Sequence, residues 1–437
     1  MSLTPPVKVH EVLSRYMLAD GFDQIVDLEN SHGSWIYDPI SDREYLDLFS
    51  CVASMPVGWN HPGVLSRKDE LTQAAIHKPS NSDIYSTQMT GFVDTFSRLA
   101  KPEEFPYFFF VSGGALGVEN ALKAAFDWKM RKRLARGKSA DVELQVIHFK
   151  QAFHGRTGYT LAITDSADIR KTQYFPQFAW PRITNPKIAF PLEEHLEQVR
   201  ALEDQALHEI KEAVVTNSDR IAALIIEPIQ GEGGDNHFRA EFLQALRTIC
   251  NEEQIMFILD EIQTGVGLTG KFWAYQHFSV TPDMIAFGKK TQVCGFMCSD
   301  RIDEVDHNVF HESNRLNSTW GGNLVDMVRC SIYLEIIQKE GLVDKAAEQG
   351  EYLLQRLVEF QGTHPDTIGN ARGRGLMCAF DLPTSKERDR LLQLIRNQGA
   401  LLLGCGSRTI RFRPHLNISK AEIDTGMDII ASALKAL

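Results

Sequence analysis

The hydrophobic pattern in the middle of the chain alternates between short apolar runs and longer stretches with helical spacing. A short run that is apolar throughout is typical of a strand with both faces buried in a parallel sheet. The expected strands span residues 107–111, 144–149, 221–226, 256–259 and 283–287, and the expected helices between them span residues 115–134, 192–213 and 240–250. Strands that alternate with helices favour an α/β fold with a doubly wound, mostly parallel sheet.

The pattern differs on both sides of this region. The first part of the chain mixes a short helical stretch with two strand-like pieces, and the last part has long helices followed by short strands and a final helix. We therefore expect an N-terminal arm over residues 1–60 that contributes to a small domain, a large α/β domain over 61–322, and a C-terminal small α+β domain over 323–437.

Composition narrows the class of protein. The 437 residues hold 46 Lys+Arg and 57 Asp+Glu, a net charge of −11 with no strongly basic block, which disfavours nucleic acid and membrane surfaces as partners. The seven cysteines are scattered without a CxxC pair, so we expect neither a disulfide framework nor a zinc site. No apolar run is long enough to span a bilayer and the N-terminus has no signal core, so we expect a cytoplasmic protein.

Two expected strands end in residues that suit one cofactor. Asp260 ends the apolar run over 256–259, and Gly288-Lys289-Lys290 follows the run over 283–287. Pyridoxal 5′-phosphate (PLP) needs a lysine for its aldehyde and a carboxylate that keeps its pyridine nitrogen protonated.

A nucleotide site is the alternative for this stretch. Residues 265–271, Gly-Val-Gly-Leu-Thr-Gly-Lys, nearly match a Walker A loop, and residues 258–261 resemble a Walker B strand. However, Phe272 stands where a Ser or Thr must hold magnesium, and the loop follows the acidic strand instead of preceding it. We interpret the match as mostly accidental and the glycines as a turn that directs Gln263 towards the cofactor ring.

Other loops that follow strands offer further contacts for such a cofactor. Gly114 and Ala115 open a helix, where backbone N–H groups can bind a phosphate. Phe153 could stack on a flat ring, and Arg156 could bind a carboxylate bidentately. Each feature alone is equally consistent with an ordinary turn, a core aromatic or a surface arginine.

Two glycine-rich loops complete the set. Residues 227–234 carry Glu227 and Glu232 after a strand, and residues 317–322 are polar and uncharged, as suits a second phosphate contact. Solvated acids and a plain loop are the alternatives. Ligands of open α/β sheets gather at the carboxyl ends of the strands, so the loops together predict one site.

The combined spacing resembles a known family. Asp260-Glu261-Ile262-Gln263-Thr264-Gly265, followed by residues 283–289, is similar to the signature of the class III (ω-) aminotransferases of PLP fold type I. The resemblance extends from residues 45–49 to residues 411–414. It implies an aspartate aminotransferase-like fold, with a mostly parallel seven-stranded sheet and a smaller α+β domain, and PLP as the cofactor.

Within the class, the lysine 6-aminotransferase branch is the most similar. The stretches that carry this similarity are residues 113–116, 119–129, 288–295 and 316–323. The class usually has a Ser-Gly-Thr turn at the phosphate and a Lys-Gly pair at the catalytic lysine, whereas this chain has Gly-Gly-Ala and Lys-Lys. These departures weaken a match to ornithine or 4-aminobutyrate aminotransferases.

The resemblance assigns roles to the residues of the site. Lys289 would form the Schiff base and move the proton, Lys290 would be structural, and Asp260 would pair with the pyridinium nitrogen. The residues implied to contact the cofactor are Gly114, Ala115, Phe153, Asp260, Gln263, Lys289, Ser318 and Thr319. In this fold type Ser318 and Thr319 typically come from the partner subunit, so a homodimer with composite sites is expected.

The resemblance also implies how two substrates share the site. L-Lysine would give its ε-amino group to 2-oxoglutarate, yielding 2-aminoadipate 6-semialdehyde, which cyclises, and L-glutamate. Arg411 would bind the α-carboxylate of 2-oxoglutarate and L-glutamate, Glu232 would pair with Arg411 when lysine binds, and Arg156 would bind the distal carboxylate. Gln263 would contact substrate as well as cofactor. Arg413 lies on the same strand face as Arg411, and the spacing to Pro414 selects Arg411.

The alternatives are another ω-aminotransferase that acts on ornithine or 4-aminobutyrate, and a PLP-dependent isomerase that needs no acceptor. The isomerase would share all the cofactor residues, so only a requirement for 2-oxoglutarate separates it from a transaminase.

Overall fold

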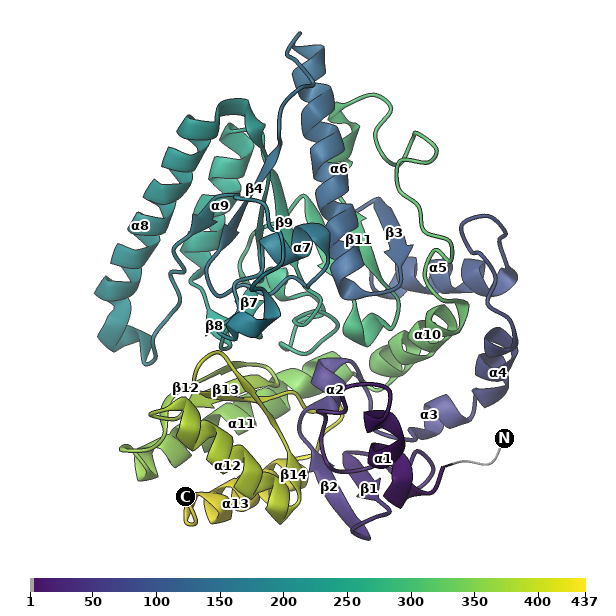
Figure 1. Cartoon of the computed structure of the whole chain (residues 1–437), viewed down its shortest axis with the longest axis vertical. Coiled ribbons are helices and arrows are strands. Elements are labelled where there is room, and N and C mark those ends of the chain that lie inside the picture. Colours follow the sequence, from purple (N-terminus) through teal and green to yellow (C-terminus); the bar gives the residue numbers. More distant parts are fainter. Residues whose placement is uncertain (1–3) are drawn as a thin grey trace.

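The computed structural model describes residues 4–437 and has a large and a small part (Figure 1). The large part is built on a seven-stranded sheet, as predicted. Its strands, in spatial order, are β3 (Tyr107–Val111), β11 (Cys294–Cys298), β10 (Met284–Phe287), β9 (Met256–Asp260), β6 (Ile221–Ile226), β4 (Gln145–Phe149) and β5 (Arg182–Ile183). The strands from β10 to β5 are parallel, and β11 runs antiparallel to both β10 and β3.

Helices cover both faces of this sheet. Alternate residues of β9 point to opposite sides: Met256 and Ile258 pack with α6 (Gly114–Ala135), whereas Phe257 and Leu259 belong to the core on the other face. That second face is covered by α5 (Thr87–Leu99), α8 (Leu192–Asn217), α9 (Ala240–Glu252) and α10 (Leu324–Lys339). Because both faces are buried, the strands are apolar throughout, which explains why the pattern predicted them.

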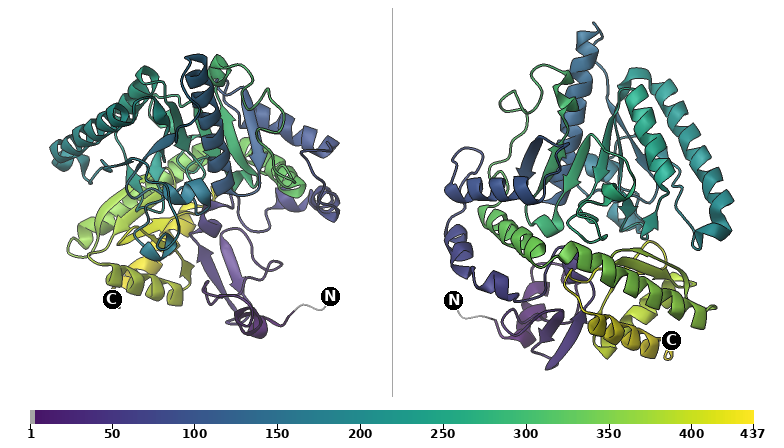
Figure 2. Two further views of the ribbon diagram at one scale, coloured as in Figure 1. Left: turned by 45° about the horizontal axis from the view of Figure 1, so that its top comes forward. Right: turned by 180° about the vertical axis from the view of Figure 1, so that it is seen from behind.

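The small part combines the two ends of the chain. Its four-stranded antiparallel sheet has the order β12 (Gly369–Arg374), β13 (Met377–Asp381), β16 (Thr409–Phe412) and β15 (Leu403–Cys405). Its helices are α11 (Leu342–Thr363), α12 (Ser385–Gln398) and α13 (Lys420–Leu434). A second sheet has β1 (Trp35–Asp38), β2 (Arg43–Asp47) and β14 (Ala400–Leu401). Since β14 pairs with β2, the N-terminal strands lie beside the C-terminal segment (Figure 2).

Short elements complete the chain. They are α1 (Val9–Ser14), α2 (Ser50–Ala53), α3 (Pro62–Leu65), α4 (Lys68–Ile76), α7 (Gly158–Ala162), β7 (Ile229–Gln230) and β8 (Asn236–His237). Helix α10 packs against α4 and α5 of the large part, although it lies beyond the boundary we expected near residue 323.

Helix α2 is a left-handed turn. Ser50, Cys51, Val52 and Ala53 have φ values of 40°, 52°, 61° and 60°, and the next residue, Ser54, reaches the central cavity. Left-handed backbone costs L-residues about 1–2 kcal/mol each because Cβ approaches the following carbonyl oxygen. Contacts hold this turn in place: the Ser50 hydroxyl donates to the Arg413 carbonyl (2.6 Å), and the Gln292 amide donates to the Ser54 carbonyl (2.7 Å).

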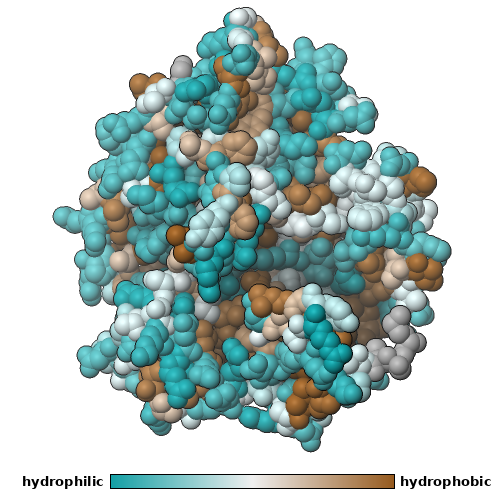
Figure 3. Space-filling model, viewed as in Figure 1, coloured by the Kyte–Doolittle hydropathy of each residue, from teal (hydrophilic) through white to brown (hydrophobic). Residues whose placement is uncertain are grey.

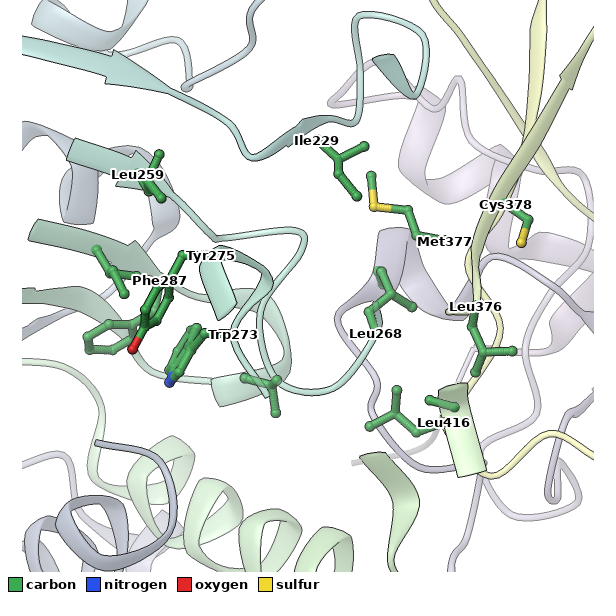
Figure 4. Close-up of a cluster of buried hydrophobic side chains, with 14 of the residues drawn as sticks. Ile229, Leu259, Leu268, Trp273, Tyr275, Phe287, Leu376, Met377, Cys378 and Leu416 are labelled. Carbon is green, nitrogen blue, oxygen red and sulfur yellow. The ribbon is translucent and has the colours of Figure 1, made fainter. Parts of the chain in front are cut away.

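The Walker-like loop joins the two parts of the molecule. Leu268 is fully buried beside Leu376 and Leu416, and its carbonyl accepts the Leu376 N–H at 2.9 Å (Figure 4). A Cβ on Gly270 would lie 2.9 Å from the Ala347 Cβ. The space in front of these glycines is therefore filled by the small part, so the loop is an interdomain contact and not a phosphate cradle.

None of the helices in residues 4–437 is long and apolar enough to cross a membrane. All seven cysteines are free. On the face shown in Figure 3, hydrophilic and hydrophobic residues are interspersed, and the surface is hollowed between the large and the small part.

Candidate active site

A cavity of about 520 Å³ lies at the carboxyl ends of the central strands, where the sequence predicted a site. Six of the predicted residues line it, and they come from the loops after β3, β4, β9 and β10. These residues are Gly114, Ala115, Phe153, Asp260, Gln263 and Lys289. Arg156, Glu232, Arg411, Ser318 and Thr319 are not among its lining residues.

Asp260 ends strand β9 and is held in one orientation. Its Oδ2 atom lies 2.7 Å from Nδ1 of His154, and its Oδ1 atom accepts the Ile262 N–H at 3.1 Å. Both side chains are buried, and the His154 N–H donates to the Thr164 hydroxyl at 3.0 Å. Sequence reasoning missed this role of His154, although its place beside Phe153 in a loop after a strand was a usable signal.

Lys289 follows β10 on a strained backbone. It has φ of 54°, a conformation that non-glycine residues rarely adopt and that is concentrated at functional sites. Its side chain reaches the cavity, and burial, followed by the positive charges of Arg411 and Arg413, lowers its pKa to about 8. A lysine with a lowered pKa is an effective amine nucleophile, because more of it is neutral near physiological pH.

This lowered pKa predicts how the cofactor-free chain captures PLP. The neutral amine is the nucleophile, so the attachment rate should rise with pH and level off above a midpoint near 8. Stopped-flow absorbance after mixing with PLP, followed from about pH 6 to about pH 11, measures this midpoint. Arg411→Met should raise the midpoint, since it removes a like charge. A midpoint at the ordinary lysine value of 10.5 in the unmodified chain would contradict the prediction.

Lys290 points away from the cavity. Its Nζ donates to the Gln263 carbonyl at 2.9 Å, and burial together with the charge of Lys289 lowers its pKa well below the usual value. Its observed contact is thus to the backbone of the loop that carries Gln263.

Glu227 connects two loops of the site. Its carboxylate accepts the Phe153 N–H at 2.9 Å and the Gly231 N–H at 3.0 Å, so it ties the loop that carries the aromatic ring to the glycine-rich loop. Burial raises the pKa of Glu227 to about 7, and Asp260 contributes in the same direction.

The start of helix α6 forms one wall of the cavity. Gly113 has φ of 105° and no side-chain cap covers the helix, so the first-turn N–H groups of Gly114 and Ala115 have no acceptor within the helix. Such an end binds anions. A Cβ on Gly117 would lie 2.8 Å from the Gly295 carbonyl oxygen, so glycine there allows the helix to pack closely on β11.

Arg411, in β16, and Arg413, just after this strand, have different partners. Arg413 forms a buried ion pair with Asp235, and its Nε donates to Oε1 of Gln263 at 2.8 Å. Arg411 contacts the same Gln263 oxygen at 3.5 Å, and its buried Nε has no hydrogen-bond partner among the described residues. Of the two, Arg411 is thus the one without a carboxylate partner.

Glu232 makes no ion pair with Arg411 in this substrate-free structure, so the pairing expected when lysine binds stays a prediction. Its Oε1 instead contacts the Lys171 ammonium and accepts the Ser166 hydroxyl at 2.8 Å. Lys171, which is distant in sequence, supplies the cation that Glu232 contacts here. Arg156 is exposed, with its guanidinium 5.9 Å from the centre of the Phe153 ring.

Ser318 and Thr319 lie on a loop away from the cavity of the same chain. The Ser318 hydroxyl accepts the Gly321 N–H at 3.1 Å, and the exposed Thr319 contacts Ser80 and Ser82 through its carbonyl. Within one chain these two residues therefore make no contact with the cavity.

Comparison with known proteins identifies the family. The family model described as aminotransferase class-III matches residues 17–434. The chain belongs to this family. It is 50% identical over 434 residues to the L-lysine-epsilon aminotransferase of Mycobacterium tuberculosis, covering 99% of this chain and 96% of that protein. It is 47% identical over 433 residues to the Streptomyces clavuligerus L-lysine-epsilon aminotransferase, covering 98% and 94% of the two chains.

The fold agrees with this assignment. The chain superposes on lysine aminotransferase from M. tuberculosis in the internal aldimine form with a TM-score of 0.97 and 50% identity, covering 99% of this chain and 100% of that one. The predicted PLP fold type I is thus confirmed, and PLP is the cofactor of the class.

The cavity fits PLP at three places. The α6 N-terminus offers unpaired N–H donors for a phosphate, Phe153 offers an aromatic face, and Lys289 and Asp260 offer an amine and a carboxylate on neighbouring strands. The N–H donors suit the phosphate of the cofactor, and the aromatic face suits its ring. The amine suits its aldehyde, and the carboxylate suits its pyridine nitrogen.

Proposed function

We propose that this chain transfers the ε-amino group of L-lysine to 2-oxoglutarate. The products are 2-aminoadipate 6-semialdehyde, which cyclises spontaneously, and L-glutamate. The observation that carries the proposal is the 47–50% identity, over nearly the whole chain, to proteins named L-lysine-epsilon aminotransferase.

In this proposal the cofactor is held from three sides. Gly114 and Ala115 donate N–H groups to its phosphate, Phe153 stacks on its ring, and Asp260 pairs with its pyridine nitrogen while His154 keeps that carboxylate in place. When bound, PLP supplies an electron sink for the negative charge that develops at the substrate carbon. Lys289 takes the proton from that carbon through its Nζ atom and returns it during transfer.

The two substrates place different charges at Arg411. The α-carboxylate of 2-oxoglutarate can pair with it, whereas lysine brings only its methylene chain, and a buried guanidinium left unpaired costs about 3–5 kcal/mol. We propose that Glu232 supplies the missing charge when lysine binds and that Arg156 binds the distal carboxylate of either substrate. The partnerless Nε of Arg411 and the partnerless Oε2 of Glu232 support this assignment.

We further propose a homodimer in which Ser318 and Thr319 complete the partner's phosphate site, as the family resemblance implies. Their loop is accompanied by the exposed apolar side chains Ile84, Tyr85 and Trp320, which a partner subunit would cover. The domain division at residues 60 and 322 and a reducing, cytoplasmic setting are likewise proposals; free cysteines support the latter.

A substrate panel tests the activity. The holoenzyme is incubated with 2-oxoglutarate and L-lysine, L-ornithine or 4-aminobutyrate, glutamate is quantified, and the cyclic imine is trapped with an aromatic amino-aldehyde. We expect glutamate and the trapped imine with lysine, and no amino-group transfer when 2-oxoglutarate is omitted. Turnover of ornithine or 4-aminobutyrate without lysine would move the chain to another ω-aminotransferase, and turnover of lysine without an acceptor would favour an isomerase.

A further inference from the structure

Glu232 forms an ion pair with Lys171, a residue to which the proposed reaction assigns no role. Lys171 contacts its Oε1, and the Ser166 hydroxyl donates to the same oxygen at 2.8 Å. The side chains of Lys171 and Glu232 are 22% and 20% exposed, so the pair is largely shielded from solvent. The second oxygen of Glu232 is buried and has no partner among the described residues. The contact therefore occupies only one half of the carboxylate.

Glu232 pairs with Lys171, while Arg411 has no carboxylate partner among the described residues. Arg413, by contrast, pairs with Asp235. A carboxylate that moves to Arg411 must leave the Lys171 ammonium, and one that returns must leave Arg411. Glu232 thus has two possible positions. On Lys171 it leaves Arg411 unpaired, and on Arg411 it leaves Lys171 unpaired.

We propose that Lys171, supported by Ser166, is the second binding position of Glu232 and sets the balance between the two substrates. This inference rests on the proposed function. A dicarboxylate places a carboxylate on Arg411 and requires Glu232 to be docked on Lys171. A substrate with an aliphatic chain at Arg411 requires Glu232 to leave Lys171. Lys171 is a positioning residue, because it acts on substrate choice through Glu232.

The proposal predicts opposite effects on two kinds of ligand. Apparent affinity falls in proportion to the population of the binding-competent arrangement. Removing the Lys171 charge lowers the population in which Glu232 is turned away from Arg411. A dicarboxylate should then bind about tenfold more weakly if that population falls to about one tenth, while a ligand with one carboxylate should bind equally well or better.

Isothermal titration calorimetry of the holoenzyme tests this with two unreactive probes. Glutarate carries a carboxylate at each end, and hexanoate has one carboxylate and an aliphatic end. Lys171→Met should weaken glutarate binding about tenfold without weakening hexanoate binding, and Lys171→Arg should restore the glutarate affinity. Arg170→Gln is the matched control: this exposed neighbour pairs with Asp168, so both affinities should stay unchanged.

A double-variant cycle separates this role from simple structural damage. In a Glu232→Ala background, Lys171→Met should change neither affinity, because the carboxylate it competes for is gone. Equal weakening of both probes by Lys171→Met, or a glutarate effect that persists in the Glu232→Ala background, would overturn the proposal. Transfer from lysine by the unmodified enzyme is scored separately, so failure of the proposed function and failure of this inference give different results.

Discussion

Replacing Lys289 with Ala should lower kcat by about 10³-fold or more and abolish the near-visible absorbance of lysine-bound PLP. Lys289 is the lysine that reaches the cavity, and its pKa of about 8 leaves much of the amine neutral near physiological pH. Without it, the substrate carbon loses its base and the cofactor loses its attachment. Purified protein, scanned for absorbance and assayed with lysine and 2-oxoglutarate, gives both readouts.

Lys290 provides the control for this experiment. Lys290→Met removes an adjacent lysine whose Nζ bonds to the Gln263 carbonyl, so it should keep the absorbance band. If Lys289→Ala retained the band and Lys290→Met lost it, the assignment of the two lysines would have to be exchanged.

Asp260→Asn should lower kcat by about 10²–10⁴-fold, because removing one partner of a buried charged pair costs about 3–5 kcal/mol. Asparagine keeps the size of the side chain and can still accept the Ile262 N–H through its oxygen. It loses the negative charge that would hold the pyridine nitrogen protonated. Steady-state kinetics with saturating PLP measure the fall in kcat.

Glu261→Gln is the matched control for Asp260→Asn. Glu261 is also buried, but its carboxylate accepts from the Thr264 hydroxyl and from the Ala274 and Tyr275 N–H groups. Burial raises its pKa to about 7. Glutamine keeps the size of the side chain but turns one acceptor towards a backbone N–H into a donor, so we expect a loss of stability and a smaller fall in kcat than in Asp260→Asn. Equal losses in the two variants would show that Asp260 has no role beyond structure.

The parts of the fold that the sequence predicted are those with a continuous local signal. The strands over 107–111 and 221–226 have the predicted bounds. Strand β11 was missed because Cys294-Gly295-Phe296 directly follows the turn of Lys289 and contains a glycine, which usually weakens a strand. Here that glycine is needed, since a Cβ on Gly295 would lie 1.9 Å from the Phe109 carbonyl oxygen.

In the candidate site, too, the residues with a local sequence signal could be predicted and the contacts between distant residues could not. Asp260, Lys289 and Phe153 could be predicted because each follows a strand whose carboxyl end faces the cavity. The partner of Glu232 could not, because it depends on the conformation of a side chain near Lys171, which is distant in sequence. The choice between Arg411 and Arg413 likewise depends on Asp235, whose contact with Arg413 no strand pattern shows.

The left-handed turn of α2 is a locally frustrated part of the cavity rim. Its backbone preference opposes the overall fold, and its side chains include the β-branched Val52. The Ser50 hydroxyl donates to the carbonyl of Arg413, which closely follows Arg411, and the Gln292 amide, from the segment after Lys289, donates to the Ser54 carbonyl. The strained turn is therefore held by hydrogen bonds to two segments, the one that carries Arg413 and the one that follows Lys289, so a shift of either segment would act on the same edge of the cavity.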